Sequence, residues 1–509
     1  MLQKVFTSGL KGVDPFVVEV EVDTARGLNA FEIVGLAEMA VRESKVRVKS
    51  AIVNSGYAFP KKRITVNLAP ADVKKMGTAY DLPMAIGVLA TEGRVPEAVL
   101  KETVFFGELG LDGAIKATRG VLPVALGAQA LGFRRLAVSA GNAAEAAAVG
   151  GLEVVPAENI SELCEILNDR LEPQPIEVDD GRWFEDEADA LPDLNDIRGQ
   201  EQARRALEIA AAGGHNLLMI GPPGSGKTML ARRMPGILPQ MNNDEAVETT
   251  KLYSVAGMLD GRLGLVRRRP FRAPHHTISD VALVGGGAIP RPGEISLAHN
   301  GVLFLDELPE FHRSVLEVMR QPLEERHVNI ARAAFSVDFP ADFMLLGAMN
   351  PCPCGHHGNP RHVCLCSSTQ IDRYRSRLSG PLLDRIHLQV EVPSVPLEKL
   401  RGRAEGESSA TVRGRVEEAR AIQGLRFAGL GFRTNARMGV RELERFAGLG
   451  DDETRFLERA VDRLGLSARA YHGVQKVART IADLDAVEAL SVAHLAEALQ
   501  YRLKDGAKP

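Results

Sequence analysis

A glycine-rich segment at residues 221–228 constrains the fold more than any other feature of the chain. An apolar run at 216–220 precedes it and a helical pattern at 229–234 follows it. A strand, a glycine-rich loop and a helix in this order form a P-loop, whose backbone N–H groups surround phosphate oxygens. The eight expected ATP-binding residues are Gly221, Pro222, Pro223, Gly224, Ser225, Gly226, Lys227 and Thr228. We expect Lys227 to reach the β- and γ-phosphates and the Thr228 hydroxyl to hold Mg²⁺.

A second apolar run, 301–305, leads into two carboxylates and predicts a buried parallel strand. Asp306 is expected to bind Mg²⁺ through water, and Glu307 to polarise the water that attacks the γ-phosphate. A third predicted strand, 343–349, ends in Asn350, whose side chain can orient that water and sense the γ-phosphate. The long interval between the P-loop and Asp306 allows an intervening strand and a large insertion, as in an AAA+ core. The pattern therefore predicts hydrolysis of ATP, and not only its binding.

Length and composition indicate a multidomain globular protein. At 509 residues the chain has room for about three domains. Its hydrophobic fraction of 45% and charged fraction of 25% are ordinary for a soluble protein. No apolar run approaches the roughly 18 residues of a membrane span, and the amino-terminus lacks the pattern of a signal peptide. We therefore expect a cytoplasmic protein without a membrane partner. Because the net charge is −4, any contact with nucleic acid must come from local basic patches.

Four units are predicted along the chain, in an α/β multidomain fold. Residues 1–170 alternate between strand and helix patterns and predict a mixed α+β domain. Residues 171–192 are acidic and contain proline, as in a solvated linker. Residues 193–396 hold the P-loop and predict the AAA+ core. Residues 397–509 begin as a flexible hinge and continue with helical periodicity, which predicts a helical lid domain.

The first unit resembles the proteolytic domain of Lon-type proteases. The resemblance rests on three stretches in the same order: 107–113, 120–123 and 144–167. Lon-type catalysis requires a serine nucleophile and a lysine base. This chain has no serine at 75–81, where that family has its serine motif, and no lysine at 120–125. We therefore expect a Lon-like fold without protease activity; the alternative is that Thr78 replaces the serine.

Two basic features of the core suggest contact with DNA. An unusually long insertion, 262–298, carries His275, His276 and four arginines that are either DNA contacts or a solvated surface. These are Arg267, Arg268, Arg269 and Arg272. Further on, a turn expected at 338–342 suggests a hairpin-like insertion just before Asn350. In the AAA+ clade that includes the MCM replicative helicases, such a hairpin points into a central channel, and Arg332 matches its basic residue.

Four cysteines gather in a short segment after Asn350. They are Cys352, Cys354, Cys364 and Cys366. Two Cys-x-Cys pairs can place four thiolates around Zn²⁺, with three nearby histidines, His356, His357 and His362, as spare candidates. The alternative is a loop of reduced thiols that hold no metal.

Two arginines outside the P-loop have catalytic interpretations. Arg385 follows a helical stretch and resembles the arginine finger that one subunit of a ring ATPase supplies to the next. The simpler alternative is an intramolecular pair with Asp384. Arg469 follows a predicted helix cap, Ser467, and is placed like the second sensor, which contacts the γ-phosphate from the lid.

Taken together, the chain resembles the ComM/YifB family over essentially its whole length. The most specific motifs are 350–355 and 382–386, set in a magnesium chelatase-like AAA+ core. The resemblance implies a homohexameric, ATP-driven and Mg²⁺-dependent DNA helicase that promotes branch migration during natural transformation. Two alternatives come from other classes, namely a chelatase-type motor that acts on a partner other than DNA, and an ATP-dependent protease. A purely structural ATP-binding protein fits less well, because Glu307, Asn350 and Arg385 are all present.

Overall fold

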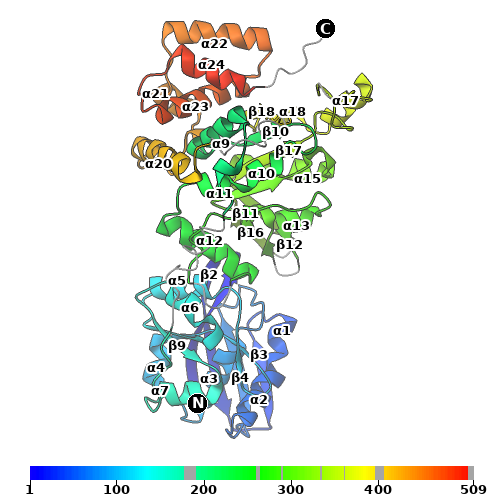
Figure 1. Ribbon diagram of the computed structural model, residues 1–509. Helices are drawn as coiled ribbons and strands as arrows, with labels where there is room; N and C mark the ends of the chain where they lie inside the picture. The colour runs from blue at the N-terminus through cyan, green and yellow to red at the C-terminus, as the bar shows by residue number, and fades with distance from the viewer. Residues whose placement is uncertain are drawn as a thin grey trace.

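The computed structural model describes residues 1–176, 191–259, 264–287, 290–332, 335–359, 362–395 and 406–502. Most of the expected linker at 171–192, and the first part of the hinge, lie outside these ranges. Three parts follow one another along an elongated molecule (Figure 1). The amino-terminal domain lies at one end, the P-loop core in the middle and the carboxy-terminal helices at the other end.

The amino-terminal domain is built on a seven-stranded sheet in the order β3-β4-β2-β1-β5-β8-β9. Its strands are β1 (Leu2–Lys11), β2 (Asp14–Ala25), β3 (Ala30–Val34), β4 (Arg63–Ala69), β5 (Thr103–Phe105), β8 (Arg135–Ser139) and β9 (Glu153–Ala157). A separate two-stranded hairpin joins β6 (Glu108–Leu109) and β7 (Ile115–Lys116). Its helices are α1 (Met39–Arg42), α2 (Ser44–Asn54), α3 (Asp81–Thr91), α4 (Glu97–Glu102), α5 (Val121–Ala130), α6 (Ala143–Ala147) and α7 (Ile160–Leu167). Helix α3 is buried along its whole length, so the sheet is covered by a central helix.

The P-loop core is a five-stranded sheet in the order β11-β14-β17-β10-β18, in which every neighbouring pair is parallel. Its strands are β10 (Leu217–Ile220), β11 (Phe271–Arg272), β14 (Val302–Leu305), β17 (Met344–Met349) and β18 (Leu388–Glu391). Short hairpin strands are β12 (Gly285–Gly286), β13 (Arg291–Pro292), β15 (His327–Arg332) and β16 (Phe335–Pro340). Its helices are α9 (Glu201–Gly213), α10 (Lys227–Arg232), α11 (Met234–Ile237), α12 (Asn243–Ala256), α13 (Asp280–Val284), α14 (Glu294–Leu297), α15 (Arg313–Val318), α16 (Arg320–Glu325), α17 (Ser368–Arg375) and α18 (Gly380–Leu383). The intervening strand predicted between the P-loop and Asp306 is β11, which pairs with β14.

The hairpin before β17 differs from the sequence prediction. Strands β15 and β16 pair antiparallel, with His327 opposite Pro340 and Arg332 opposite Phe335. The turn therefore follows Arg332, and most of the segment 338–342, which we expected to be the turn, lies in β16. Asp338, Pro340 and Asp342 are residue types that favour turns, and they led us to expect the strand to be interrupted there. The cross-strand pairing outweighs this local preference. Arg332 is the last residue of β15 and pairs with Phe335.

The carboxy-terminal part is helical, as predicted. Its helices are α20 (Ser409–Arg426), α21 (Val440–Phe446), α22 (Asp451–Leu464), α23 (Ala468–Leu484) and α24 (Val492–Gln500). Ser467 caps α23 by accepting a hydrogen bond from the Ala470 amide, which confirms the predicted cap.

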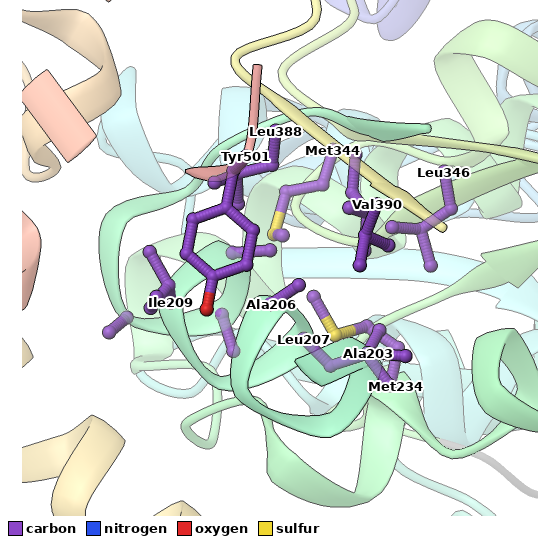
Figure 2. Packing of buried hydrophobic residues seen from close by; sticks show 14 of the residues in the cluster. Ala203, Ala206, Leu207, Ile209, Met234, Met344, Leu346, Leu388, Val390 and Tyr501 are labelled. Carbon is purple, nitrogen blue, oxygen red and sulfur yellow. The ribbon is translucent and has the colours of Figure 1, made fainter. Parts of the chain in front are cut away.

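One hydrophobic cluster joins these helices to the P-loop core. It contains residues of α9, β10, β17 and β18 together with residues of α20 and α23. Figure 2 shows Tyr501, from the end of the described chain, packed beside Ile209, Ala206 and Leu388. The Tyr501 carbonyl also accepts a hydrogen bond from the amide of Gln389 at 2.7 Å. The lid is therefore attached to the core by shared apolar burial, which makes α23 a stable neighbour of the sheet.

The amino-terminal domain packs against the core through α12. The Ser254 carbonyl of α12 accepts a hydrogen bond from the Gly120 amide at 3.1 Å, and its hydroxyl donates to the Glu145 carboxylate at 2.5 Å. Glu145 is buried, and this burial raises the pKa of its carboxyl. The turn between β1 and β2 makes a second contact, because Val13 belongs to the hydrophobic cluster that includes Leu252 and Phe339. The Lon-like domain is thus in direct contact with the hairpin strand β16.

Among the described residues, no helix has both the length and the apolar content that a membrane crossing requires.

Candidate ATPase site

The carboxyl ends of β10, β14 and β17 form one edge of the sheet, and three predicted site segments follow them. The P-loop connects β10 to α10, and Lys227 is the first residue of that helix. Asp306 follows β14, and Asn350 follows β17, the strand between β10 and β14. Because the strands are parallel, the topology brings these residues together although they are far apart in the sequence.

The backbone of the P-loop favours glycine at Gly221, at Gly226 and at Gly224, whose φ is 73°. At Gly221 a Cβ atom would lie 2.1 Å from the Val392 carbonyl oxygen, so no larger residue fits. Gly226 has a φ of 92° and turns the chain into α10. Between them, the Ser225 hydroxyl is buried and has no partner among the described residues. Helix α10 opens directly from this loop, so its free N–H groups point to a place suited to a phosphate.

Lys227 is buried and lies against the loop. Its Nζ donates to the carbonyls of Gly221 at 2.7 Å and Pro222 at 3.0 Å, and to Asn350 Oδ1 at 3.3 Å. Burial lowers the pKa of Lys227, and the negative charges of Asp306 and Glu307 oppose that effect. A phosphate oxygen would be a stronger acceptor than a neutral carbonyl, because its hydrogen bond to the ammonium joins opposite charges.

Thr228 and Asp306 meet as the predicted Mg²⁺ pair. The Thr228 hydroxyl donates to Asp306 Oδ2 at 2.7 Å. A hydroxyl and a carboxylate are hard oxygen ligands, and Mg²⁺ usually takes one or two such groups and completes its shell with water and phosphate oxygens. The donor set therefore fits Mg²⁺ bound together with a nucleotide.

Glu307 stands at the sheet edge in an uncommon backbone conformation. Its φ is 52° and its ψ is 44°, in the left-handed region, where residues other than glycine are uncommon. Its carboxylate is half exposed and lies 3.3 Å from Nδ1 of His276, a residue of the long insertion. The sequence drew attention to His276 but gave it no role, because only the fold shows that the insertion returns to the end of β14.

Arg385 lies at the opposite side of the sheet, where the parallel strands have their amino ends. Its carbonyl accepts a hydrogen bond at 2.8 Å from Asn216, the residue just before β10, whereas the P-loop begins just after β10. The four residues of β10 separate these edges by roughly 13 Å along the strand. Arg385 therefore cannot reach a nucleotide bound at the P-loop of the same chain. Its ion-pair partner is Glu324 of α16, and not Asp384 as the simpler alternative proposed.

Arg469 accompanies Arg385. Its Nη2 lies 3.1 Å from Oε1 of the same Glu324, and the cap of its helix, Ser467, donates to Asp384 at 3.1 Å. The two candidate arginines thus lie close together, because both contact Glu324.

Most of the insertion arginines have partners within the chain. Arg272 makes a two-pronged ion pair with Glu294, at 2.6 and 2.7 Å. Arg269 pairs with Glu245 at 2.9 Å and donates to backbone carbonyls. These ion pairs make the guanidinium groups of Arg269 and Arg272 less available to DNA than that of an exposed arginine. Arg267 remains exposed.

The four cysteines of the loop after Asn350 converge. All four Sγ atoms lie within 4.8 Å of one another, and Cys352 is 3.5 Å from Cys354 and 3.7 Å from Cys364. Four thiolates around one Zn²⁺ at about 2.3 Å would be separated by about 3.8 Å. Hydrogen bonds from the backbone N–H groups of His356 and Leu365 lower the pKa of Cys354 to about 6, whereas desolvation and the neighbouring thiols raise the pKa of Cys364 and of Cys366. The cluster could therefore bind zinc.

The purified protein is expected to contain about one zinc ion per chain, because four converging thiolates are a complete ligand set. Changing Cys352 and Cys366 together to serine should remove the zinc. The control is Cys164→Ser, which changes a cysteine of the amino-terminal domain outside the cluster and should leave the zinc in place. Metal analysis by plasma mass spectrometry measures this. Zinc-free protein from a preparation made without chelator would contradict the prediction.

The amino-terminal domain does not assemble a serine–lysine pair. The Thr78 hydroxyl donates to the Glu108 carboxylate, and the nearby Lys75 is buried and donates to the Pro70 carbonyl. The amine of Lys75 therefore points to the Pro70 carbonyl and not to Thr78.

The parallel sheet in this order and the residues at its carboxyl edge define the chain as an AAA+ ATPase. The family described as "Magnesium chelatase, subunit ChlI" matches residues 193–400, and "Magnesium chelatase, subunit ChlI C-terminal" matches 406–502. A third match, "Subunit ChlI of Mg-chelatase", covers residues 20–142 in the amino-terminal domain.

Relatives along the whole chain give the narrower family. The chain is 46% identical to the competence protein ComM of Haemophilus influenzae, over 98% of this chain and 97% of that protein. It is 44% identical to YifB of Escherichia coli, over 99% of this chain and 97% of that protein. It also shares 30% identity over 188 residues with Lon protease 2 of Bacillus subtilis, which covers 31% of this chain and 33% of that protein. The chain belongs to the ComM/YifB family.

Proposed function

We propose that this AAA+ ATPase is a homohexameric motor that moves DNA, and that it promotes branch migration of recombination intermediates during natural transformation in the cytoplasm. The observation that carries the ring is the position of Arg385, at the sheet edge opposite its own P-loop. An arginine finger in that position can act only on the ATP of a neighbouring subunit. The name of the relative, a competence protein, supports the biological setting.

Within one active site, the residues divide the chemistry. Lys227 neutralises phosphate charge, and Thr228 and Asp306 would hold Mg²⁺, which supplies further charge neutralisation when it is bound with ATP. Glu307 would orient a water molecule toward the γ-phosphate, and Asn350, already hydrogen-bonded to Lys227, would contact that phosphate. The neighbouring subunit would supply Arg385 and Arg469 to stabilise the transition state.

The hairpin β15–β16 is the proposed DNA contact. Arg332 ends β15 beside the turn, so a ring of six subunits would offer six such residues. Contacts of arginine with phosphates carry no sequence information, so DNA binding is expected to be sequence-independent and strongly dependent on salt. Arg267, exposed on the insertion, is a second candidate.

The deciding experiment is a migration assay on a four-way DNA junction with labelled arms. The wild-type protein with ATP is expected to move the branch point, and DNA should raise its ATPase rate. Arg332→Ala should keep the basal ATPase rate and lose both effects. The alternative, a chelatase-type motor, rests on the match of the core to magnesium chelatase. It becomes the better account if wild-type protein hydrolyses ATP but neither moves junctions nor responds to DNA.

His276→Ala is expected to lower ATP turnover about tenfold with little change in ATP affinity, because loss of its contact lets the Glu307 carboxylate leave its position. His276→Asn retains an N–H donor and should restore part of the rate. The matched control is His275→Ala, whose side chain faces Thr277 at 2.9 Å. Steady-state ATPase kinetics measure the effect, and equal turnover of His276→Ala and wild type would show that the contact is incidental.

A further inference from the structure

Among the ion pairs of the described residues, Glu324 is the one residue that pairs with both Arg385 and Arg469. Its Oε2 accepts from Arg385, and its Oε1 lies 3.1 Å from Nη2 of Arg469. Arg385 belongs to the P-loop core, whereas Arg469 belongs to α23 of the lid. One carboxylate on α16 therefore connects two parts of the subunit.

The charges explain why such a bridge is needed. Two guanidinium groups side by side repel each other, and a carboxylate between them removes most of that repulsion. The interaction with Arg385 lowers the pKa of Glu324, so the carboxylate is charged at neutral pH. Without it, the two arginines would separate, and each could adopt several rotamers.

Of the two arginines, Arg469 is the one that is open to another group, whereas the side chain of Arg385 is only 13% exposed. Arg385 uses Nη1 for the Pro381 carbonyl at 2.7 Å and Nη2 for Glu324, and its Nε is buried with no hydrogen-bond partner among the described residues. Arg469 is half exposed. A guanidinium group has five N–H donors, so the contact with Glu324 still leaves donors on Arg469 for a phosphate. Next to them lies an open hollow of about 290 Å³, lined by Glu317, Arg320, Gln321, Glu324, Glu325 and Arg385.

We propose that Glu324 is a positioning residue, which holds Arg385 and Arg469 side by side in the arrangement that the ATP of the neighbouring subunit requires. The inference rests on the proposed ring ATPase. Glu324 does not touch the nucleotide in this account; it acts through the two arginines. Its substitution should therefore affect catalysis in the neighbouring site and leave the subunit's own P-loop intact.

The test compares Glu324→Gln with Glu317→Gln in the full chain. The Glu317→Gln substitution removes the same charge beside the same hollow. Glu317, however, pairs with Arg320 at 2.7 Å and with neither Arg385 nor Arg469 among the ion pairs of the described residues. Glu324→Gln is expected to lower turnover between about tenfold and about a hundredfold, because misplaced catalytic groups lose rate on that scale. The affinity for a fluorescent ATP analogue should stay within about twofold, since the P-loop is unchanged. Glu317→Gln should match wild type in both measurements.

Mixing subunits shows whether Glu324 acts on the neighbour. Glu324→Gln subunits offer an intact P-loop, and Lys227→Ala subunits offer an intact arginine face, so a mixture should regain part of the lost ATPase rate. A misfolded variant, or one defective in its own site, would not complement in this way. Glu324→Asp, which keeps the charge, should be less impaired than Glu324→Gln.

The outcomes separate this inference from the proposed function. If Arg385→Ala hydrolyses ATP at the wild-type rate, the ring ATPase itself is wrong. If Arg385→Ala is inactive but Glu324→Gln turns over like wild type or faster, only the role of Glu324 is refuted. Failure of the mixture to recover activity, with both variants folded by circular dichroism, would also refute it.

Discussion

Glu307→Gln is expected to bind ATP as tightly as the wild type and to hydrolyse it at least about a hundredfold more slowly, because an amide cannot take a proton from water in the transition state. The structure supports this separation of roles, since Glu307 contacts His276 and makes no hydrogen bond to the P-loop. A slow step after binding should leave ATP trapped on the protein. Filter binding with labelled ATP, together with a single-turnover assay, measures both parts of the prediction.

Lys227→Ala is the matched contrast for this prediction. The Lys227 ammonium is buried among the loop carbonyls and Asn350, where it is the only cation in contact with the P-loop among the described residues. Its removal should abolish nucleotide binding, and not merely slow the reaction. Equal hydrolysis by Glu307→Gln and wild type would contradict the assignment of Glu307, whereas normal ATP binding by Lys227→Ala would contradict that of the P-loop.

The sequence was sufficient for the P-loop core because its signals are local. The apolar runs before Gly221, Asp306 and Asn350 are long enough to predict strands, and parallel strands bring their carboxyl ends together at one edge. Helix α23 was predicted from its periodicity and from the serine cap. In each case a few neighbouring residues carry the information.

The features that the sequence did not reveal depend on contacts between distant segments. The turn of the β15–β16 hairpin was misplaced because Asp338 and Pro340 favour turns locally, while the register of the pair is fixed by the burial of Val337 and Phe339. Strand β1 was not predicted, although it pairs along its whole length with β2.

The roles of His276 and Glu324 also depend on contacts between segments that are distant in the sequence. Nothing next to Glu324 in the sequence points to Arg385 or Arg469, since the three residues come from different helices and loops. An acidic residue on a short helix is more often a solvated surface group, and only the two ion pairs distinguish this one. The contact of Ser254 with Glu145, which joins the Lon-like domain to the core, was hidden for the same reason.

Arg385→Ala is expected to keep ATP binding and to lose at least about a thousandfold in turnover, the scale of arginine fingers in related reactions. The physical reason is that Arg385 lies at the edge of the sheet opposite its own P-loop, so each active site is complete only when a second subunit contributes it. Mixing Arg385→Ala with Lys227→Ala should restore part of the activity, because some interfaces then join an intact P-loop to an intact arginine. The control is Arg320→Ala, a change of the same charge beside the same hollow, whose side chain pairs with Glu317 and which should retain wild-type turnover. If Arg385→Ala were inactive and the mixture gained nothing, Arg385 would be needed only within its own subunit. The case for a ring would then lose its main support, even with Lys227 and Glu307 confirmed.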